Sequence, residues 1–190
     1  GDTKNLFPAL PASNFSKDIQ GSPLPAITAS TKTYHLPDTL KAVFYDKGYY
    51  WFRNRHTMTK KTLEMDVTAI KQMGINTLER TMPGFYDDIL EKILDKNKIR
   101  LIARLSVLLS PEVIEDNSMA EKEKQRILSI VKNNRSKKNI IAWNLGDDVL
   151  FNLDNQTFHP GYFYFRNKYA AWLSSLCNEI RLLDTERPIV

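Results

Sequence analysis

The 190-residue chain is poor in the residues that several kinds of functional site require. Its single cysteine, Cys177, excludes a disulfide framework, a cysteine-rich zinc module and an iron–sulfur site. Its seven glycines form neither of the common phosphate-binding loop motifs, G-x-G-x-x-G or G-x-x-x-x-G-K-[ST]. Its three histidines lack H-x-H and H-E-x-x-H spacing, and there is no G-x-S-x-G motif of serine hydrolases. The sequence therefore indicates no metal site and no cofactor.

Long apolar runs are also missing, so the sequence predicts no membrane span, which needs about 18 consecutive apolar residues. The 42% of hydrophobic residues is nevertheless enough for a buried core, and the net charge is +5. The densest basic run, residues 132–138, has no interleaved aromatic residues that could stack on bases. We interpret this run as a solvated helix end and expect no nucleic-acid partner.

The first 38 residues differ from the rest of the chain. They contain five of the nine prolines, interleaved with Ser, Thr, Asn and Gly, and no apolar period lasts a full helical turn. This composition predicts a linker or extended arm over residues 1–38, followed by one domain over residues 39–190. A leader of this kind often follows a removed export signal or lipid anchor, so we expect an extracytoplasmic protein, periplasmic or at the cell surface.

From residue 39 onward, strand and helix patterns alternate. Aromatic runs on both sides of residues 46–48 suggest a short hairpin. The patterns predict about five parallel strands (residues 41–45, 75–78, 99–105, 139–143 and 187–190) and four helices (59–74, from about 85, from 118, and 162–183). Within the third helix, residues 118–121 match a capping box. The predicted class is α/β with a parallel sheet, and the periodicity leaves a doubly wound sheet and a (β/α) barrel equally open.

Four segments in a fixed order carry a family resemblance. They are Asn54-Arg55-His56, residues 66–77 with Phe85-Tyr86-Asp87 beyond them, residues 143–148 (W-N-L-G-D-D) and residues 184–188 (D-T-E-R-P). The series resembles N-R-H, D-I-x-L-M-K-x-x-x-x-N with F-Y-D, W-S-L-G-N-E and D-x-T-R-P in the barrels of family-2 glycoside hydrolases, the β-galactosidase and β-glucuronidase group. The resemblance covers about residues 42–190, the first half of such a barrel. It implies a partial (β/α) barrel of TIM type.

The resemblance also implies a retaining glycosidase mechanism, in which one carboxyl group protonates the leaving oxygen and a second attacks the anomeric carbon. Asp148 stands at the position of the acid/base. The residues expected to bind the sugar, an oligo- or polysaccharide, are Asn54, His56, Arg80, Trp143, Asn144 and Asp147.

Three departures from the family pattern count against catalysis. Asp147-Asp148 replaces Asn-Glu, which makes the acid/base side chain one methylene shorter. Thr81-Met82-Pro83 replaces S-H-Y-P, so the sugar-binding His is absent, and the Arg before it is either Arg80, with Glu79 inserted, or is replaced by Glu79. A one-residue slip of this kind turns a side chain to the other face of the strand. The nucleophile lies on the seventh strand of the family barrel, to which none of these 190 residues corresponds.

Two functions therefore stay open: an impaired glycosidase-like domain that acts on or binds a β-linked glycan, and a non-catalytic glycan-binding or assembly module. The aromatic residues of the segment 151–165 either stack on pyranose rings or anchor the last helix. Half a barrel has two open parallel edges, which invite pairing with other strands. We expect the arm, a second copy of the chain or a C-terminal half to cover them.

Overall fold

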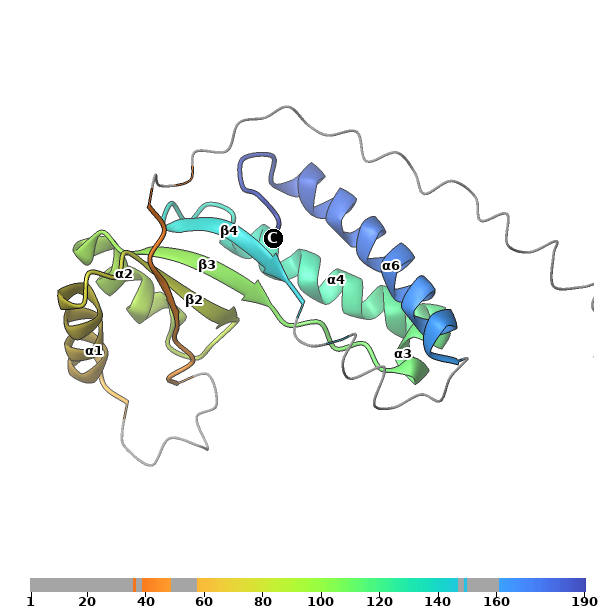
Figure 1. The fold of residues 1–190 in the computed structure, drawn as a ribbon, viewed down its shortest axis with the longest axis horizontal. Helices are drawn as coiled ribbons and strands as arrows, with labels where there is room; N and C mark the ends of the chain where they lie inside the picture. Colours follow the sequence, from red (N-terminus) through yellow and green to blue (C-terminus); the bar gives the residue numbers. More distant parts are fainter. Residues whose placement is uncertain (1–35, 37–38, 49–57, 147–148, 150–160) are drawn as a thin grey trace, which may run out of the picture. The chain divides into compact units, whose positions relative to one another are not determined.

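The structure, a computed structural model, describes residue 36, residues 39–48, 58–146, 149 and 161–190 (Figure 1). These residues belong to one compact unit, Tyr34–Val190. Four of the predicted site residues, Asn54, His56, Asp147 and Asp148, lie outside the described residues. So do the arm up to residue 35 and the second half of the suggested hairpin.

A parallel sheet of four strands forms the centre of this unit. The strands are β1 (Ala42–Phe44), β2 (Thr77–Met82), β3 (Arg100–Leu105) and β4 (Ile140–Leu145), and they pair in the order β1-β2-β3-β4. The prediction of about five strands needs correction, because the last segment forms only an isolated parallel bridge from Ile189 to Trp143. That bridge lies beside β4, where a fifth strand of the same sheet would pair.

Helices follow the strands. They are α1 (Lys60–Gln72), α2 (Asp87–Asn97), α3 (Pro111–Glu115), α4 (Asn117–Asn134) and α6 (Gly161–Leu183). The described residues thus contain five helices rather than the four expected. The addition is α3, a five-residue helix in the connection after β3 that has too few residues to show a helical period in the sequence.

The strand order decides between the two architectures that the sequence left open. Each described connection runs from one parallel strand to its immediate neighbour, always in the same direction along the sheet. Because such crossovers are right-handed, connections that all advance in one direction place their helices on one face of the sheet. A doubly wound sheet requires a reversal of strand order. The fold is therefore α/β with the topology of a partial (β/α) barrel.

Local signals explain two helix boundaries. Thr59 caps α1 as predicted: its hydroxyl accepts from the backbone N–H of Thr62, while the Thr62 hydroxyl accepts from the Thr59 N–H. The capping prediction for α4 is wrong. The carboxylate of Asp116 accepts from the backbone N–H groups of Ser118 and Met119, so the helix begins one residue before Ser118. A nearer carboxylate thus outcompetes the Ser118 hydroxyl as the cap.

The two faces of the sheet have different environments. One face packs against helices and is buried, with Leu78 on β2 beside Leu101 on β3 and with Ala103 on β3 between Arg80 on β2 and Trp143 on β4. The other face is partly exposed and carries both polar and apolar side chains. It carries Phe44, Glu79, Ile102, Arg104, Ala142 and Asn144, which we call the open face. In a closed barrel this face points into the interior, where side chains from successive strands meet.

Candidate functional site

A polar cluster occupies the open face where β2, β3 and β4 run side by side. One carboxylate oxygen of Glu79 accepts two hydrogen bonds, from Nε of Arg104 at 2.9 Å and from Nδ2 of Asn144 at 2.6 Å. The Arg104 guanidinium also lies over the ring of Phe44, 4.7 Å from its centroid. Three strands and one aromatic ring from β1 therefore contribute to a single cluster, with Glu79 at its centre.

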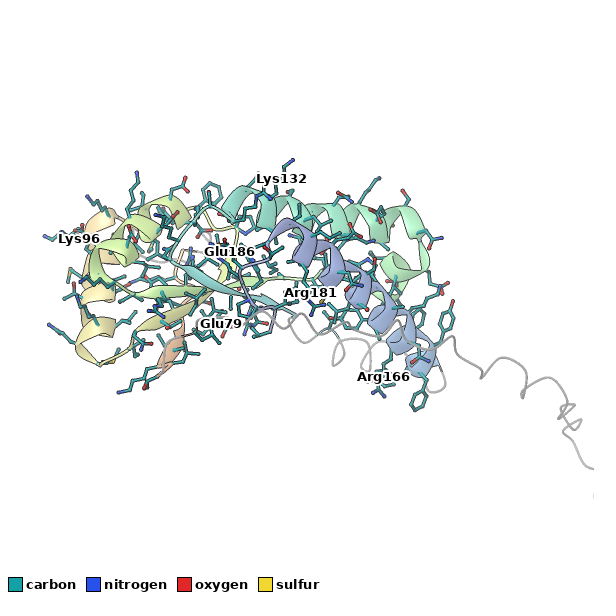
Figure 2. All side chains as sticks on the ribbon, turned by 90° about the horizontal axis from the view of Figure 1, so that it is seen from above. Glu79, Lys96, Lys132, Arg166, Arg181 and Glu186 are labelled. Atoms are coloured by element: carbon teal, nitrogen blue, oxygen red, sulfur yellow. The ribbon has the colours of Figure 1, made fainter. Side chains whose placement is uncertain are left out.

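The side chains of the cluster are partly exposed to solvent. The side chains of Glu79 and Arg104 are 22% and 26% exposed, and Asn144 is half-buried. Figure 2 shows Glu79 beside the strands, on the opposite side of the molecule from Lys132 of α4. A charged pair flanked by an amide and an aromatic ring can bind hydroxyl groups in the plane of a sugar ring and contact its apolar face.

The predicted site residues divide between the two faces of the sheet. Asn144 lies on the open face and belongs to the cluster. Arg80 is 1% exposed on the other face, where its Nε pairs with Oδ1 of Asp87 at 2.8 Å and its Nη1 donates to the Lys47 carbonyl at 2.8 Å. Trp143 is fully buried on the same side as Arg80. The geometry thus gives Arg80 and Trp143 partners within the fold, and it brings neither beside Asn144.

The register of β2 places Glu79 and Arg80 on opposite faces of the sheet. Glu79 pairs with Phe44 on β1 and with Ile102 on β3, so it takes the open-face position, while Arg80 faces α2. The positive charge beside Glu79 on the open face comes from Arg104, on the next strand.

Sequence reasoning missed Arg104 and Phe44 as members of the site. A signal for Arg104 is present, because it is a charged residue within the otherwise apolar run Leu101–Leu105 of a buried strand.

The loop after β3 is fixed by Glu123, which accepts from the Leu108 backbone N–H at 2.7 Å and pairs with Arg126. In the part of the chain that the structure describes, no three histidine, cysteine or acidic residues gather as metal ligands.

Trp143 and the motif segment 184–188 form a hydrogen-bond network that stabilises the fold. Asp184 accepts hydrogen bonds from Nε1 of Trp143 at 2.9 Å and from Nη1 of Arg187 at 2.6 Å. The Arg187 guanidinium also donates to the backbone carbonyls of Ile140, Arg135 and Lys137. Burial acts to raise the pKa of Asp184, but the hydrogen bonds from Arg187 and Trp143 outweigh it and lower that pKa. This network ties the start of β4 to the end of α6.

Two residues of the second motif segment have similar structural partners. Asp66 accepts from the Tyr45 hydroxyl at 2.9 Å and pairs with Lys47 at 2.7 Å. Burial raises the pKa of Tyr45, and the neighbouring Asp66 carboxylate raises it further. Asn76 accepts from the Lys41 backbone N–H and donates to the Thr39 carbonyl. Of the described residues that carry the family resemblance, Asp66 and Asn76 therefore position β1 and β2, and Asp184 and Arg187 position β4.

Comparison with known proteins gives structural matches alone. No family model and no curated protein sequence matches the chain. Among solved structures, Bacteroides uniformis β-glucuronidase 2 covers 80% of this chain with a TM-score of 0.63 at 15% identity. The family-2 β-galacturonidase of Eisenbergiella tayi, bound to galacturonate, covers 79% with a TM-score of 0.56 at 16% identity. The β-glucuronidase of Parabacteroides merdae matches with the same three values.

These matches confirm the resemblance drawn from the four motif segments. The chain has the fold of a segment of a family-2 glycoside hydrolase. It spans 18% of the length of the B. uniformis and P. merdae enzymes and 24% of the E. tayi enzyme. At 13–16% identity the likeness is one of fold, so activity and substrate have to be argued from the site itself.

Proposed function

We propose that this domain binds a β-linked glycan on its open face, as part of a protein derived from a glycosidase barrel. The observation that carries the proposal is the cluster of Glu79, Arg104 and Asn144 on the open face of three adjacent parallel strands. Arg104 and Asn144 are the next-to-last residues of β3 and β4, and Glu79 reaches them from the middle of β2. In barrels of this type the active site is built at the carboxyl ends of the strands. Support also comes from the β-glucuronidases and the β-galacturonidase that share the fold.

Within this proposal, Asp148 acts as the acid/base surrogate, and Asn54, His56 and Asp147 join Asn144 in holding the sugar. Asn144 precedes Asp147 and Asp148 by only three and four residues, and residues 54 and 56 follow β1 in the sequence. Chemistry by the retaining route requires a second carboxylate about 5–5.5 Å from the first. The shorter Asp148 side chain also counts against high activity, since a displacement of about 1 Å can cost roughly 100-fold in rate.

The second candidate is a glycan-binding or assembly module without catalysis. The observation that favours it is the replacement of Asn-Glu by Asp147-Asp148, together with Thr81-Met82-Pro83 in place of S-H-Y-P, which lacks the sugar-binding His. For either candidate we place the protein outside the cytoplasm, at the cell surface or in the periplasm, because of the composition of residues 1–38. No described helix is both long and apolar enough to cross a membrane.

A panel of aryl β-glycosides that includes a β-galactoside, a β-glucuronide and a β-galacturonide tests both candidates. Turnover by the wild type that Asp148→Ala abolishes supports the enzyme. Binding without turnover, unchanged by Asp148→Ala and weakened by Asn144→Ala, supports the module. Gly161→Ala serves as the control, because no neighbouring atom lies within 4 Å of a Cβ added there. If neither turnover nor binding is detected with any glycan, the proposal is wrong.

A further inference from the structure

A groove of about 440 Å³ lies on the outer surface of the domain, away from the open face. Its two walls are the last turns of α4 and α6. It is lined by Gln125, Leu128, Ser129 and Lys132 from α4 and by Glu179, Leu182 and Leu183 from α6. Leu182 is 83% exposed beside it, although Leu128 is buried. A large apolar side chain thus projects next to an apolar hollow.

The two helices run in the same direction, which fixes the layout of charge along the groove. Trp172 of α6 bonds to Ala120 of α4, Glu179 to Lys124, and the Leu183 carbonyl to Arg135, so contacts advance together along both helices. Glu179 therefore lies level with Lys124, and Lys132 lies eight residues farther along α4, about 12 Å at 1.5 Å per residue. The groove has an acid at one end, a base at the other and leucines between them.

The charge pattern along the groove is complementary to that of a second copy of the groove running in the opposite direction. A twofold axis across the groove places a second copy antiparallel to the first, so that each Lys132 meets the Glu179 of the other copy. Glu179 already pairs with Lys124 at 2.9 Å, so in such a contact it would share its carboxylate between Lys124 and the Lys132 of the other copy. Lys132 is exposed and has no ion pair among the residues that the structure describes, and Glu179 is 37% exposed. The exposed Leu182 of each copy then covers the apolar hollow of the other.

From this we infer that the α4–α6 groove is a homodimer interface, and that the partner it fits is a second copy of this chain. A single-sign ligand fits less well, because an anion meets Glu179 and a cation meets Lys132. The lysine is visible on the outer side of α4, with Arg181 of α6 nearer the sheet, in Figure 2. The interface is independent of the glycan site, since Glu79 lies on the opposite side of the molecule.

Analytical ultracentrifugation of the full chain over a dilution series tests the inference. The wild type should show a monomer–dimer equilibrium, and Leu182→Glu should raise its dissociation constant by about tenfold or more, because it places two carboxylates at an apolar contact. Lys132→Glu should weaken the dimer more at low than at high salt. Met73→Glu is the matched control, since Met73 is 67% exposed at the end of α1, away from the groove.

Cross-linking gives a second, independent measurement. In a Cys177→Ser background, Leu182→Cys should form an intermolecular disulfide on oxidation much faster than Met73→Cys, because the two copies of residue 182 lie near the twofold axis. Far-ultraviolet circular dichroism checks that each variant is folded. A wild type that stays monomeric at all concentrations overturns the inference, and so does a dimer that Leu182→Glu and Met73→Glu affect equally.

Discussion

The indole Nε1 of Trp143 donates a hydrogen bond to Oδ2 of Asp184, 2.9 Å away, and so joins two of the motif segments that carry the family resemblance. Trp143 is fully buried on β4, and Asp184 follows the last residue of α6. The same carboxylate pairs with Arg187, which holds three backbone carbonyls. These motif residues therefore fix the position of a strand relative to a helix.

Asp184→Asn should destabilise the fold strongly. The substitution keeps the shape of the side chain but removes the charge that Arg187 pairs with in a nearly buried site. Breaking a buried pair in this way leaves an uncompensated charge, so we expect a loss of about 2–4 kcal/mol in the free energy of unfolding. Urea denaturation measures it. Asp88→Asn is the control, because Asp88 also pairs with a basic residue but is 91% exposed, and it should have almost no effect.

The same carboxylate should contribute to acid sensitivity. Because the pKa of Asp184 is lowered in the folded protein from its ordinary value of 3.8, its stabilising effect is fully present above that value. The effect is lost as the pH falls below 3.8 and through the lower pKa of the folded state. The gap in unfolding free energy between wild type and Asp184→Asn should therefore be constant near neutral pH and shrink in acid. Urea midpoints measured across this pH range check it, and a gap that widens in acid contradicts it.

Gly84 is required by the ion pair between Arg80 and Asp87. A Cβ at this position would lie 2.6 Å from Nη2 of Arg80 and 2.8 Å from Oδ1 of Asp87, on two side chains that the ion pair between Nε and Oδ1 holds together. Gly84→Ala should therefore cost about 1–3 kcal/mol of stability through overpacking. Gly161→Ala meets no atom within 4 Å and should be nearly neutral. Equal thermal midpoints for the two variants would show that the pair is less rigid than the structure indicates.

Glu79→Ala should affect glycan binding more than folding. The Glu79–Arg104 pair is about a quarter exposed, and pairs of this kind contribute at most about 1 kcal/mol to stability. Removing the carboxylate frees both Arg104 and Asn144 from the partner that orients them. Calorimetric titration with the glycoside selected from the panel should show at least tenfold weaker binding, alongside a nearly unchanged urea midpoint. Unchanged binding with a large loss of stability would make Glu79 a structural residue.

The sequence was sufficient for the order of the four strands and of every described helix except α3, and for the resemblance of the fold to family-2 glycoside hydrolases. The Thr59 cap, the apolar period of α1 and the four ordered motif segments each reflect local chemistry that the fold preserves. The motif residues at Asp66, Asn76 and Asp184 turned out to hold strands and helices together, which explains why they predict the fold well.

The site was harder to predict because it depends on which face of a strand each residue occupies. Trp143 and Asn144 are neighbours in the sequence and lie on opposite faces of the sheet, and the same is true of Glu79 and Arg80. Neighbouring residues of a strand always point to opposite faces of the sheet. When both faces carry apolar residues, however, the sequence does not show which residue points to which face. The pairing of Glu79 with Arg104 also depends on the register between β2 and β3, which sequence patterns leave undetermined.

Chemical-shift mapping of the isotope-labelled chain, titrated with 4-nitrophenyl β-galactoside and 4-nitrophenyl β-glucuronide, tests most directly whether the open face binds a glycan. We predict saturable shifts at Phe44, Glu79, Arg104 and Asn144, and none at Leu128 or Leu182 on the far side of the helices. Shifts confined to the helical surface, or no shifts with either glycoside, would contradict the proposed function.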